Sequence, residues 1–83
     1  MQVIEAWHLK EPASLRRVLT CKVQLADDRV LLLSVWHSMA ARRWQALVEY
    51  EASLEFVEYR DALSWEAAVA WCERTAQALE LAS

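Results

Sequence analysis

Apolar and polar side chains alternate along residues 17–25, where the chain reads RVLTCKVQL. Every second residue in one set is apolar, namely Leu19, Cys21, Val23 and Leu25. A period of two is typical of a half-buried β-strand, so we predict a strand here. The following ADDR segment, residues 26–29, predicts a turn because Asp side chains bond to nearby backbone groups.

Residues 29–37, RVLLLSVWH, predict a second strand because they are rich in β-branched and aromatic side chains. Both faces of this strand are apolar, with Val30, Leu32 and Trp36 on one face and Leu31, Leu33 and Val35 on the other. We therefore expect a central strand that is covered on both sides. The first nine residues, MQVIEAWHL, are compatible with a short edge strand that carries Val3, Trp7 and Leu9 on one side.

The C-terminal segment, residues 61–81, predicts a long helix with Ser64 as its N-cap and Glu66 in its first turn. Its apolar side chains recur at spacings of four and three and form one stripe: Trp65, Val69, Cys72, Ala76 and Leu79. Such a stripe is typical of a helix that lies across a sheet.

Residues 38–63 are compatible with a helix or with two strands, and their β-branched and aromatic content favours strands. A turn at residues 51–53 would pair Leu47 with Val57 and Glu49 with Glu55. The absence of glycine argues against a tight hairpin.

These elements predict an α+β fold in which an antiparallel meander of three to four strands packs against one long C-terminal helix. The alternative is a β-hairpin followed by two antiparallel helices. The meander leaves a second apolar sheet face, to which we assign Leu31, Leu33, Val35, Leu47, Val57 and Tyr59. We expect the N-terminal segment or a second subunit to cover that face, which predicts a possible homodimer.

Composition supports a single domain, residues 1–83, that has a partner. The apolar fraction is 57%, five residues are Trp and none is Gly, whereas a chain this short buries only about 60–65% of its unfolded surface. The first residues do not resemble a signal peptide, and no apolar run approaches the roughly 18–20 residues that span a bilayer. With two isolated cysteines, we expect a cytoplasmic protein without membrane contact.

Catalytic and metal-binding chemistry find little support in the residues. The chain has two Cys and two His (Cys21, Cys72, His8 and His37), but no short ligand pair of the kind that zinc sites use. The absence of glycine also excludes a Gly-rich phosphate loop. We therefore expect buried free thiols, no metal, no cofactor and no enzymatic activity.

Charged residues are distributed unequally along the chain. Residues 1–43 hold seven bases and four acids, whereas residues 44–83 hold two bases and eight acids. The acids of the central segment are Glu49, Glu51, Glu55, Glu58 and Asp61. They are open to three interpretations: a solvated face, a surface that binds a partner, or a catalytic pair. We select them as a candidate partner-binding surface, together with Tyr59, Trp71 and Trp7, because exposed aromatic residues are enriched at binding hot spots.

The chain resembles small phage-borne or mobile-element inhibitors, the anti-CRISPR proteins among them, in being short, acidic, rich in Trp and free of Gly. That resemblance in composition implies an inhibitor or adaptor whose carboxylates engage a basic, nucleic-acid-binding surface of a larger protein. The alternative is a small nucleic-acid-binding module that uses the bases of the N-terminal half, Arg16, Arg17, Lys22, Arg29, Arg42 and Arg43.

Overall fold

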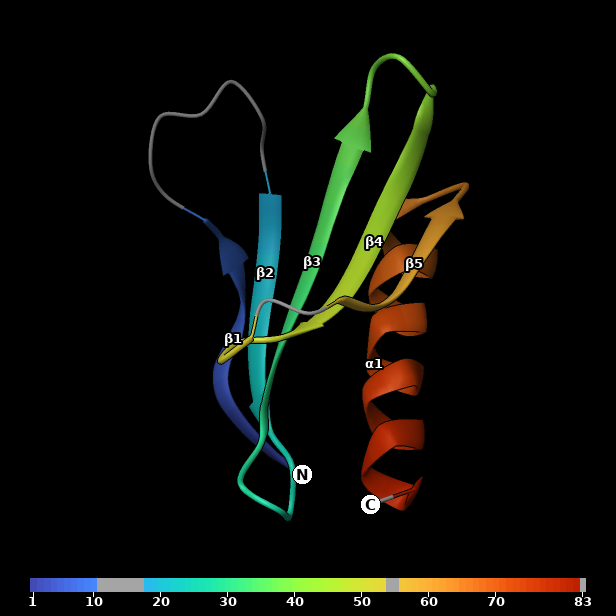
Figure 1. Cartoon of the computed structure of the whole chain (residues 1–83). Coiled ribbons are helices and arrows are strands. Elements are labelled where there is room, and N and C mark those ends of the chain that lie inside the picture. Colours follow the sequence, from blue (N-terminus) through green and yellow to red (C-terminus); the bar gives the residue numbers. More distant parts are fainter. Residues whose placement is uncertain (11–17, 54–55, 83) are drawn as a thin grey trace.

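The computed structural model describes residues 1–10, 18–53 and 56–82. They form a five-stranded antiparallel sheet and one C-terminal helix, an α+β arrangement (Figure 1). The elements are β1 (Gln2–Leu9), β2 (Val18–Gln24), β3 (Val30–Ser38), β4 (Arg43–Tyr50), β5 (Phe56–Ala62) and α1 (Trp65–Ala82). Strand order in the sheet follows chain order, so the sheet is a meander. The prediction of a meander with one long helix is confirmed, but the strand count is five instead of three to four.

The alternative with two helices is wrong because residues 43–50 form a strand. The N-terminal segment forms β1, which pairs with β2 at the sheet edge and so does not cover a sheet face. The predicted turn at residues 26–29 connects β2 to β3, where Leu25 and Arg29 are joined by a backbone hydrogen bond of 2.8 Å.

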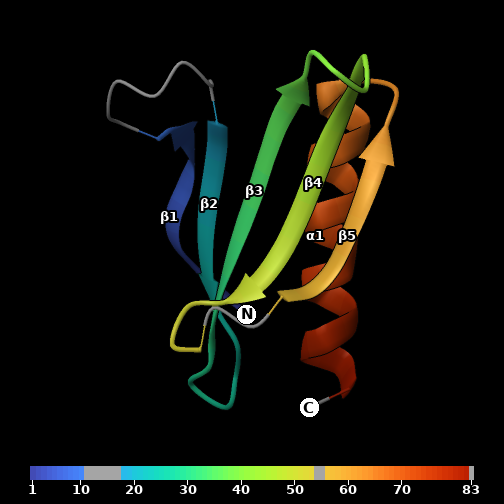
Figure 2. The same cartoon turned by 45° about the horizontal axis from the view of Figure 1, so that its top comes forward.

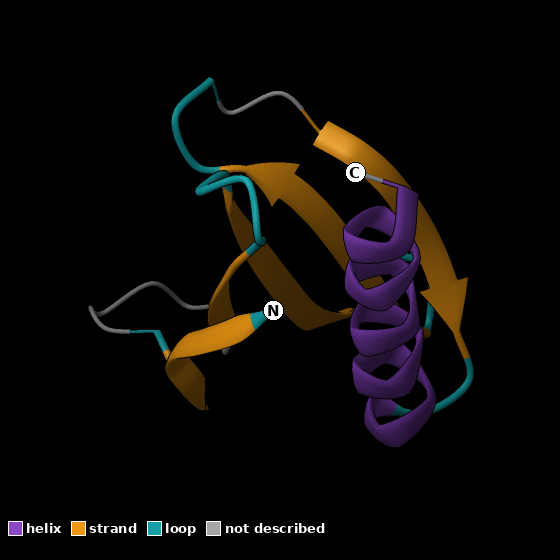
Figure 3. Cartoon of the chain, turned by 90° about the horizontal axis from the view of Figure 1, so that it is seen from below, coloured by secondary structure: helices purple, strands orange, loops and turns teal. Residues whose placement is uncertain are grey.

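One face of the sheet carries the core. Helix α1 packs on it against β3, β4 and β5 (Figure 2), and the view in Figure 3 shows the helix on this side only. The fully buried side chains under the helix include Leu31, Leu33 and Val35 from β3 and Val48 from β4. The predicted strand face of Cys21, Val23 and Leu25 is confirmed, because these residues are also buried in this core.

The second apolar face predicted from the sequence does not exist as one surface. Leu31, Leu33 and Val35 lie in the core at 0–1% exposure. Leu47 instead pairs with Ser34 and Tyr59, so it lies on the opposite side of the sheet. Pattern alone could not separate the two faces of β3, because both are apolar. A homodimer through the predicted set is therefore excluded by the position of α1.

The predicted register of the β4–β5 hairpin is also wrong. Leu47 pairs with Tyr59 instead of Val57, and Glu49 pairs with Phe56 instead of Glu55, with an irregularity between Val48 and Glu49. The connection is longer than the predicted turn, as expected where no glycine is present to form a tight one. Leu54 and Glu55, which the prediction assigned to the returning strand, lie outside the described residues.

Helix α1 begins as predicted. The backbone N–H of Ala67 donates to the Ser64 hydroxyl at 3.1 Å, which is an N-cap bond, and Glu66 lies in the first turn. Cys72 and Ala76 of the predicted stripe are buried, and Val69 and Leu79 are partly buried against the core. Trp65 is 47% exposed and so differs from the prediction.

Candidate functional site

The sheet face opposite α1 has no covering layer among the described residues, and it is the largest surface that the strands present together. We call it the open face. Paired residues of antiparallel strands point to the same side, so the register orders this face into cross-strand rows. One row joins Glu5, Lys22, Leu32 and Glu49, the next joins His8, Thr20, Ser34, Leu47 and Tyr59, and the third joins Val18, Trp36, Gln45 and Asp61.

Two aromatic side chains, one from β3 and one from β5, lie close together on the open face. The rings of Trp36 and Tyr59 are 6.4 Å apart at an interplanar angle of 45°, within the range of a favourable aromatic pair. Tyr59 is 46% exposed and Trp36 is half-buried. The pair therefore offers apolar area to a partner on an otherwise mixed surface.

Hydrogen bonds hold these aromatic side chains in place. The indole Nε1 of Trp36 donates to Gln45 Oε1 at 2.9 Å, and Gln45 Nε2 donates to Asp61 Oδ1 at 3.2 Å. The same Asp61 oxygen accepts the Tyr59 hydroxyl at 3.1 Å. Partial desolvation, followed by the hydrogen bond and the charge of Asp61, raises the pKa of Tyr59. Tyr59 thus remains a neutral phenol at physiological pH.

A second polar cluster lies on the open face at β1 and β2. Lys22 Nζ is 2.6 Å from Glu51 Oε2 and 3.7 Å from Glu5 Oε1. The hydrogen bond to Glu51 is the main reason that the pKa of Lys22 is raised, and the charge of Glu5 adds to it. The cation of Lys22 is therefore neutralised by its own neighbours.

Glu49 stands between these two clusters and differs from both. It is half-buried beside Leu32, its partner across β3 and β4. Its carboxylate makes no hydrogen bond or ion pair with any side chain in the described part of the chain. A half-buried carboxylate without a partner gains more from an incoming cation than a fully solvated one does.

The five acids predicted as one surface are divided by the fold. Glu49 and Asp61 lie on the open face, and Glu51 lies in the turn after β4 with its carboxylate on Lys22. Glu58 pairs with Val48, so it lies on the helix side of β5. Glu55 is outside the described residues. The five acids are close in the sequence, but Glu58 and Asp61 are an odd number of residues apart on one strand, so their side chains lie on opposite sides of the sheet.

The aromatic residues chosen from the sequence are also divided. Tyr59 lies on the open face as described above, whereas Trp71 is 7% exposed and belongs to the core. The expectation that Trp71 lies exposed at the stripe margin is wrong. Trp7 packs against the core from β1, and its Nε1 is buried without a hydrogen-bond partner among the described residues. Trp36 was not among the partner-binding residues predicted from the sequence, because its strand is apolar on both faces.

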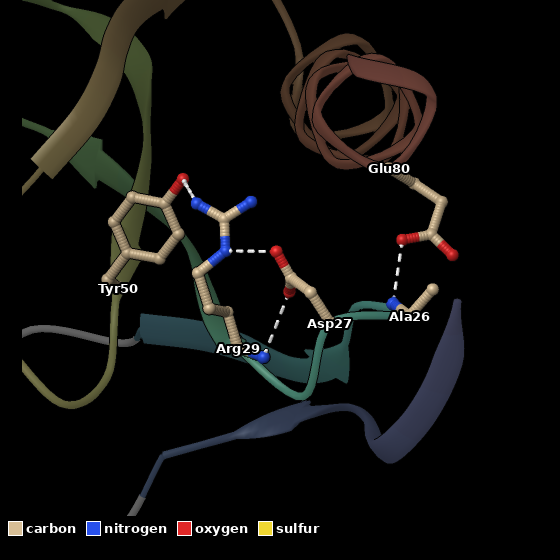
Figure 4. A network of polar contacts seen from close by, with 5 residues as sticks. All are labelled: Ala26, Asp27, Arg29, Tyr50 and Glu80. Carbon is tan, nitrogen blue, oxygen red and sulfur yellow. Dashed lines mark hydrogen bonds and ion pairs between the residues drawn. The ribbon is translucent and has the colours of Figure 1, made fainter. Parts of the chain in front are cut away.

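A groove of about 540 Å³ lies at the end of the sheet, between the β2–β3 turn and the turn after β4. The guanidinium of Arg29 crosses it, donating from Nε to Asp27 at 2.6 Å and from Nη1 to the Tyr50 hydroxyl at 2.9 Å (Figure 4). Desolvation acts to raise the pKa of Asp27, but the hydrogen bonds and charge from Arg29 outweigh it and lower that pKa. The Nε and Nη1 atoms of Arg29 are thus both bound by neighbouring side chains of the same chain.

The two cysteines are free and buried. Burial is the main cause that raises the pKa of Cys72 to about 12, and it also raises the pKa of Cys21. Neither thiol is suited to act as a nucleophile at neutral pH. Within residues 1–10, 18–53 and 56–82, no three side chains of His, Cys, Asp or Glu are grouped so as to hold a metal ion.

The described helix is not long and apolar enough to cross a membrane. In the comparisons with known proteins, no family model, no curated protein and no solved structure matches the chain.

Proposed function

We propose that this chain is a non-enzymatic protein-binding module whose open face binds a basic surface on a larger protein. The observation that carries the proposal is the position of Glu49 and Asp61 beside the exposed aromatic pair of Trp36 and Tyr59. An aromatic anchor surrounded by carboxylates is suited to a partner that presents Arg or Lys side chains.

The charge balance of the open face supports this partner chemistry. Its acids are Glu5, Glu49, Asp61 and the adjacent Glu51, whereas Lys22 is bound to two of them. Arg43, at the start of β4, is its other described base. Partners of this kind include proteins that otherwise bind nucleic acid, because carboxylates can take the places of phosphates. The inhibitor role implied by the resemblance in composition is part of this proposal.

The test compares retained proteins between variants of the chain. Immobilised wild-type protein and a Glu49→Lys, Asp61→Lys variant are incubated with host lysate, and retained proteins are quantified by mass spectrometry. Because two open-face charges are reversed, we expect a basic partner to be retained by the wild type and lost, by about tenfold or more, from the variant.

The matched control is a Glu66→Lys, Glu73→Lys variant, which makes the same charge change on exposed positions of α1. It should retain the partner as the wild type does. Circular dichroism verifies that all three proteins are folded. Equal retention of every basic protein by the open-face variant and the wild type would contradict the proposal.

A second candidate function is the binding of single-stranded nucleic acid, favoured by the exposed aromatic pair on an open sheet. The neighbouring carboxylates oppose phosphate binding, and Lys22 and Arg29 are already held by acids. Arg16 and Arg17 lie outside the described residues. A gel-shift titration with single-stranded oligonucleotides separates the two candidates, because phosphate contacts weaken steeply with added salt.

A further inference from the structure

The sheet has two edge strands, and they differ in how well their outer edges are protected. Strand β1 has irregularities of register on both sides of Glu5, and such bulges discourage another strand from pairing there. Strand β5 pairs with β4 in an unbroken register from Glu58 to Ala62. Its outer backbone groups therefore present a regular edge that can accept a further strand.

The side chains of β5 are suited to pairing with a second copy of the same strand. Glu58 and Arg60 lie on the helix side of the sheet, opposite Val48 and Ala46. Both are exposed, and neither forms an ion pair with a side chain in the described part of the chain. Tyr59, between them, lies on the open face.

We propose that two copies of this chain associate through β5, with the strands antiparallel and Tyr59 opposite Tyr59 of the second copy. In this register each Glu58 lies opposite Arg60 of the other copy, so two complementary charge pairs form on the helix side. Opposite charges across paired strands are stabilising and like charges are destabilising. A register centred on Glu58 or on Arg60 would instead oppose two like charges.

The two-fold axis of such a dimer is perpendicular to the sheet, so both helices lie on the same side and both open faces join into one. On the open side, the Trp36–Tyr59 pair of each copy meets at the axis and extends the aromatic surface. On the helix side, a groove of about 480 Å³ between β5 and α1 borders the interface. The α1 side of this groove carries Trp71, Arg74 and Leu79 beside the smaller Thr75 and Ala78.

The proposal is tested by the mass of the chain in solution and by exchange of its charges. Sedimentation velocity across a micromolar concentration series should give a species of about twice the 9.6 kDa chain mass. Glu58→Arg and Arg60→Glu should each raise the dissociation constant about tenfold or more, because each places like charges opposite one another twice. The double variant Glu58→Arg, Arg60→Glu should restore the dimer.

A mixture provides the sharpest test. Equal amounts of the Glu58→Arg and Arg60→Glu single variants should form a heterodimer, because every charge at positions 58 and 60 then meets its opposite. Glu73→Arg, on an exposed helix position that borders the β1 side of the core, is the control and should leave the dimer intact.

A wild-type chain that stays monomeric at the highest concentration would overturn the proposal. So would charge reversals that leave the dimer unchanged, or a double variant and a mixture that both stay monomeric although circular dichroism shows folded protein. The single variant Glu49→Lys changes the open face on β4 and leaves β5 intact, so it should weaken partner binding and dimerise as the wild type does. Failure of partner binding and failure of dimerisation are therefore distinguishable.

Discussion

At the scale of single residues, burial determines what the side chain of Cys72 can do. Its thiol is 0% exposed, and its Sγ lies 4.0 Å from the carbonyl oxygen of Ser34 in the core. Burial is the main cause that raises its pKa from 9.0 to about 12. This change lowers the thiolate fraction at neutral pH about a thousandfold.

We expect Cys72 in the folded protein to be alkylated at pH 8 about a thousandfold more slowly than in the denatured chain. Pulse labelling with iodoacetamide, followed by peptide mass spectrometry, measures both rates, and a Cys72→Ala variant reports Cys21 alone. Because the folded pKa is raised, the associated stability is complete below pH 9.0 and decreases as pH rises toward 12. Equal labelling rates in both states would contradict the burial of Cys72 between α1 and the sheet.

The Trp residues show which residue positions sequence pattern can and cannot locate. The stripe spacing found the core side of α1 but exchanged the roles of Trp65 and Trp71. Trp71 is about 100° from Cys72 around the helix, and a broad sheet buries a wider arc than a single stripe. Trp65 is the first helical residue and remains 47% exposed. Spacing defines the centre of a buried face better than its margins.

At the scale of elements, the turns show how a chain without glycine forms hairpins. Within the described part of the chain, positive φ occurs at Asp28, at 71°, and at Arg42, at 53°. Asp tolerates this conformation better than most residues, whereas Arg does not. The strands could thus be predicted from alternation, but the register of the β4–β5 hairpin could not. Turn length depends on local backbone conformations, and no glycine marks where this turn lies.

We expect Arg42→Gly to raise the free energy of unfolding by about 1 kcal/mol, because glycine adopts the left-handed conformation without steric strain. Urea denaturation followed by circular dichroism measures the change. Ala40→Gly is the matched control at a neighbouring position without positive φ, and it should lower stability through backbone entropy. A loss of stability in both variants would argue against strain at Arg42.

At the scale of the whole molecule, Glu80 links segments that are distant in the sequence. Its carboxylate accepts a hydrogen bond of 2.9 Å from the Ala26 N–H in the β2–β3 turn (Figure 4). It also pairs with the Met1 amino group at 2.7 Å. The N-terminus and the end of α1 lie together at one end of the molecule (Figure 1). The bond from the Met1 amino group, followed by that from Ala26, lowers the pKa of Glu80.

We expect Glu80→Gln to lower the midpoint of thermal unfolding at pH 7. The Met1 amino group loses its ion pair and the Ala26 N–H loses a charged acceptor. The folded pKa of Glu80 is lowered, so its contribution is present above the ordinary value of 4.5 and is lost as pH falls through the folded pKa. The difference between wild type and variant should therefore shrink in acid, as measured by calorimetry. Glu73→Gln, at an exposed position in the middle of α1, is the control.

The distribution of surfaces could be predicted only in part. Charge and composition indicated a binding surface in residues 48–61, and the structure places Glu49, Tyr59 and Asp61 on the open face. The central position of β3 was predicted correctly. The face of β3 that enters the core could not be predicted, because Leu31 and Leu32 are equally apolar neighbours on opposite faces. Which of them enters the core depends on where α1 packs, which is a property of the assembled molecule.

The meander order of the strands has a consequence for how the chain folds. Each strand pairs with the strand that precedes or follows it, so every hairpin closes a short stretch of chain at small entropic cost. The docking of α1 on β3 and β4 joins segments that are more distant in the sequence. We therefore expect pairing to begin in a single hairpin and the docking of α1, which buries Leu33 and Val35, to follow it.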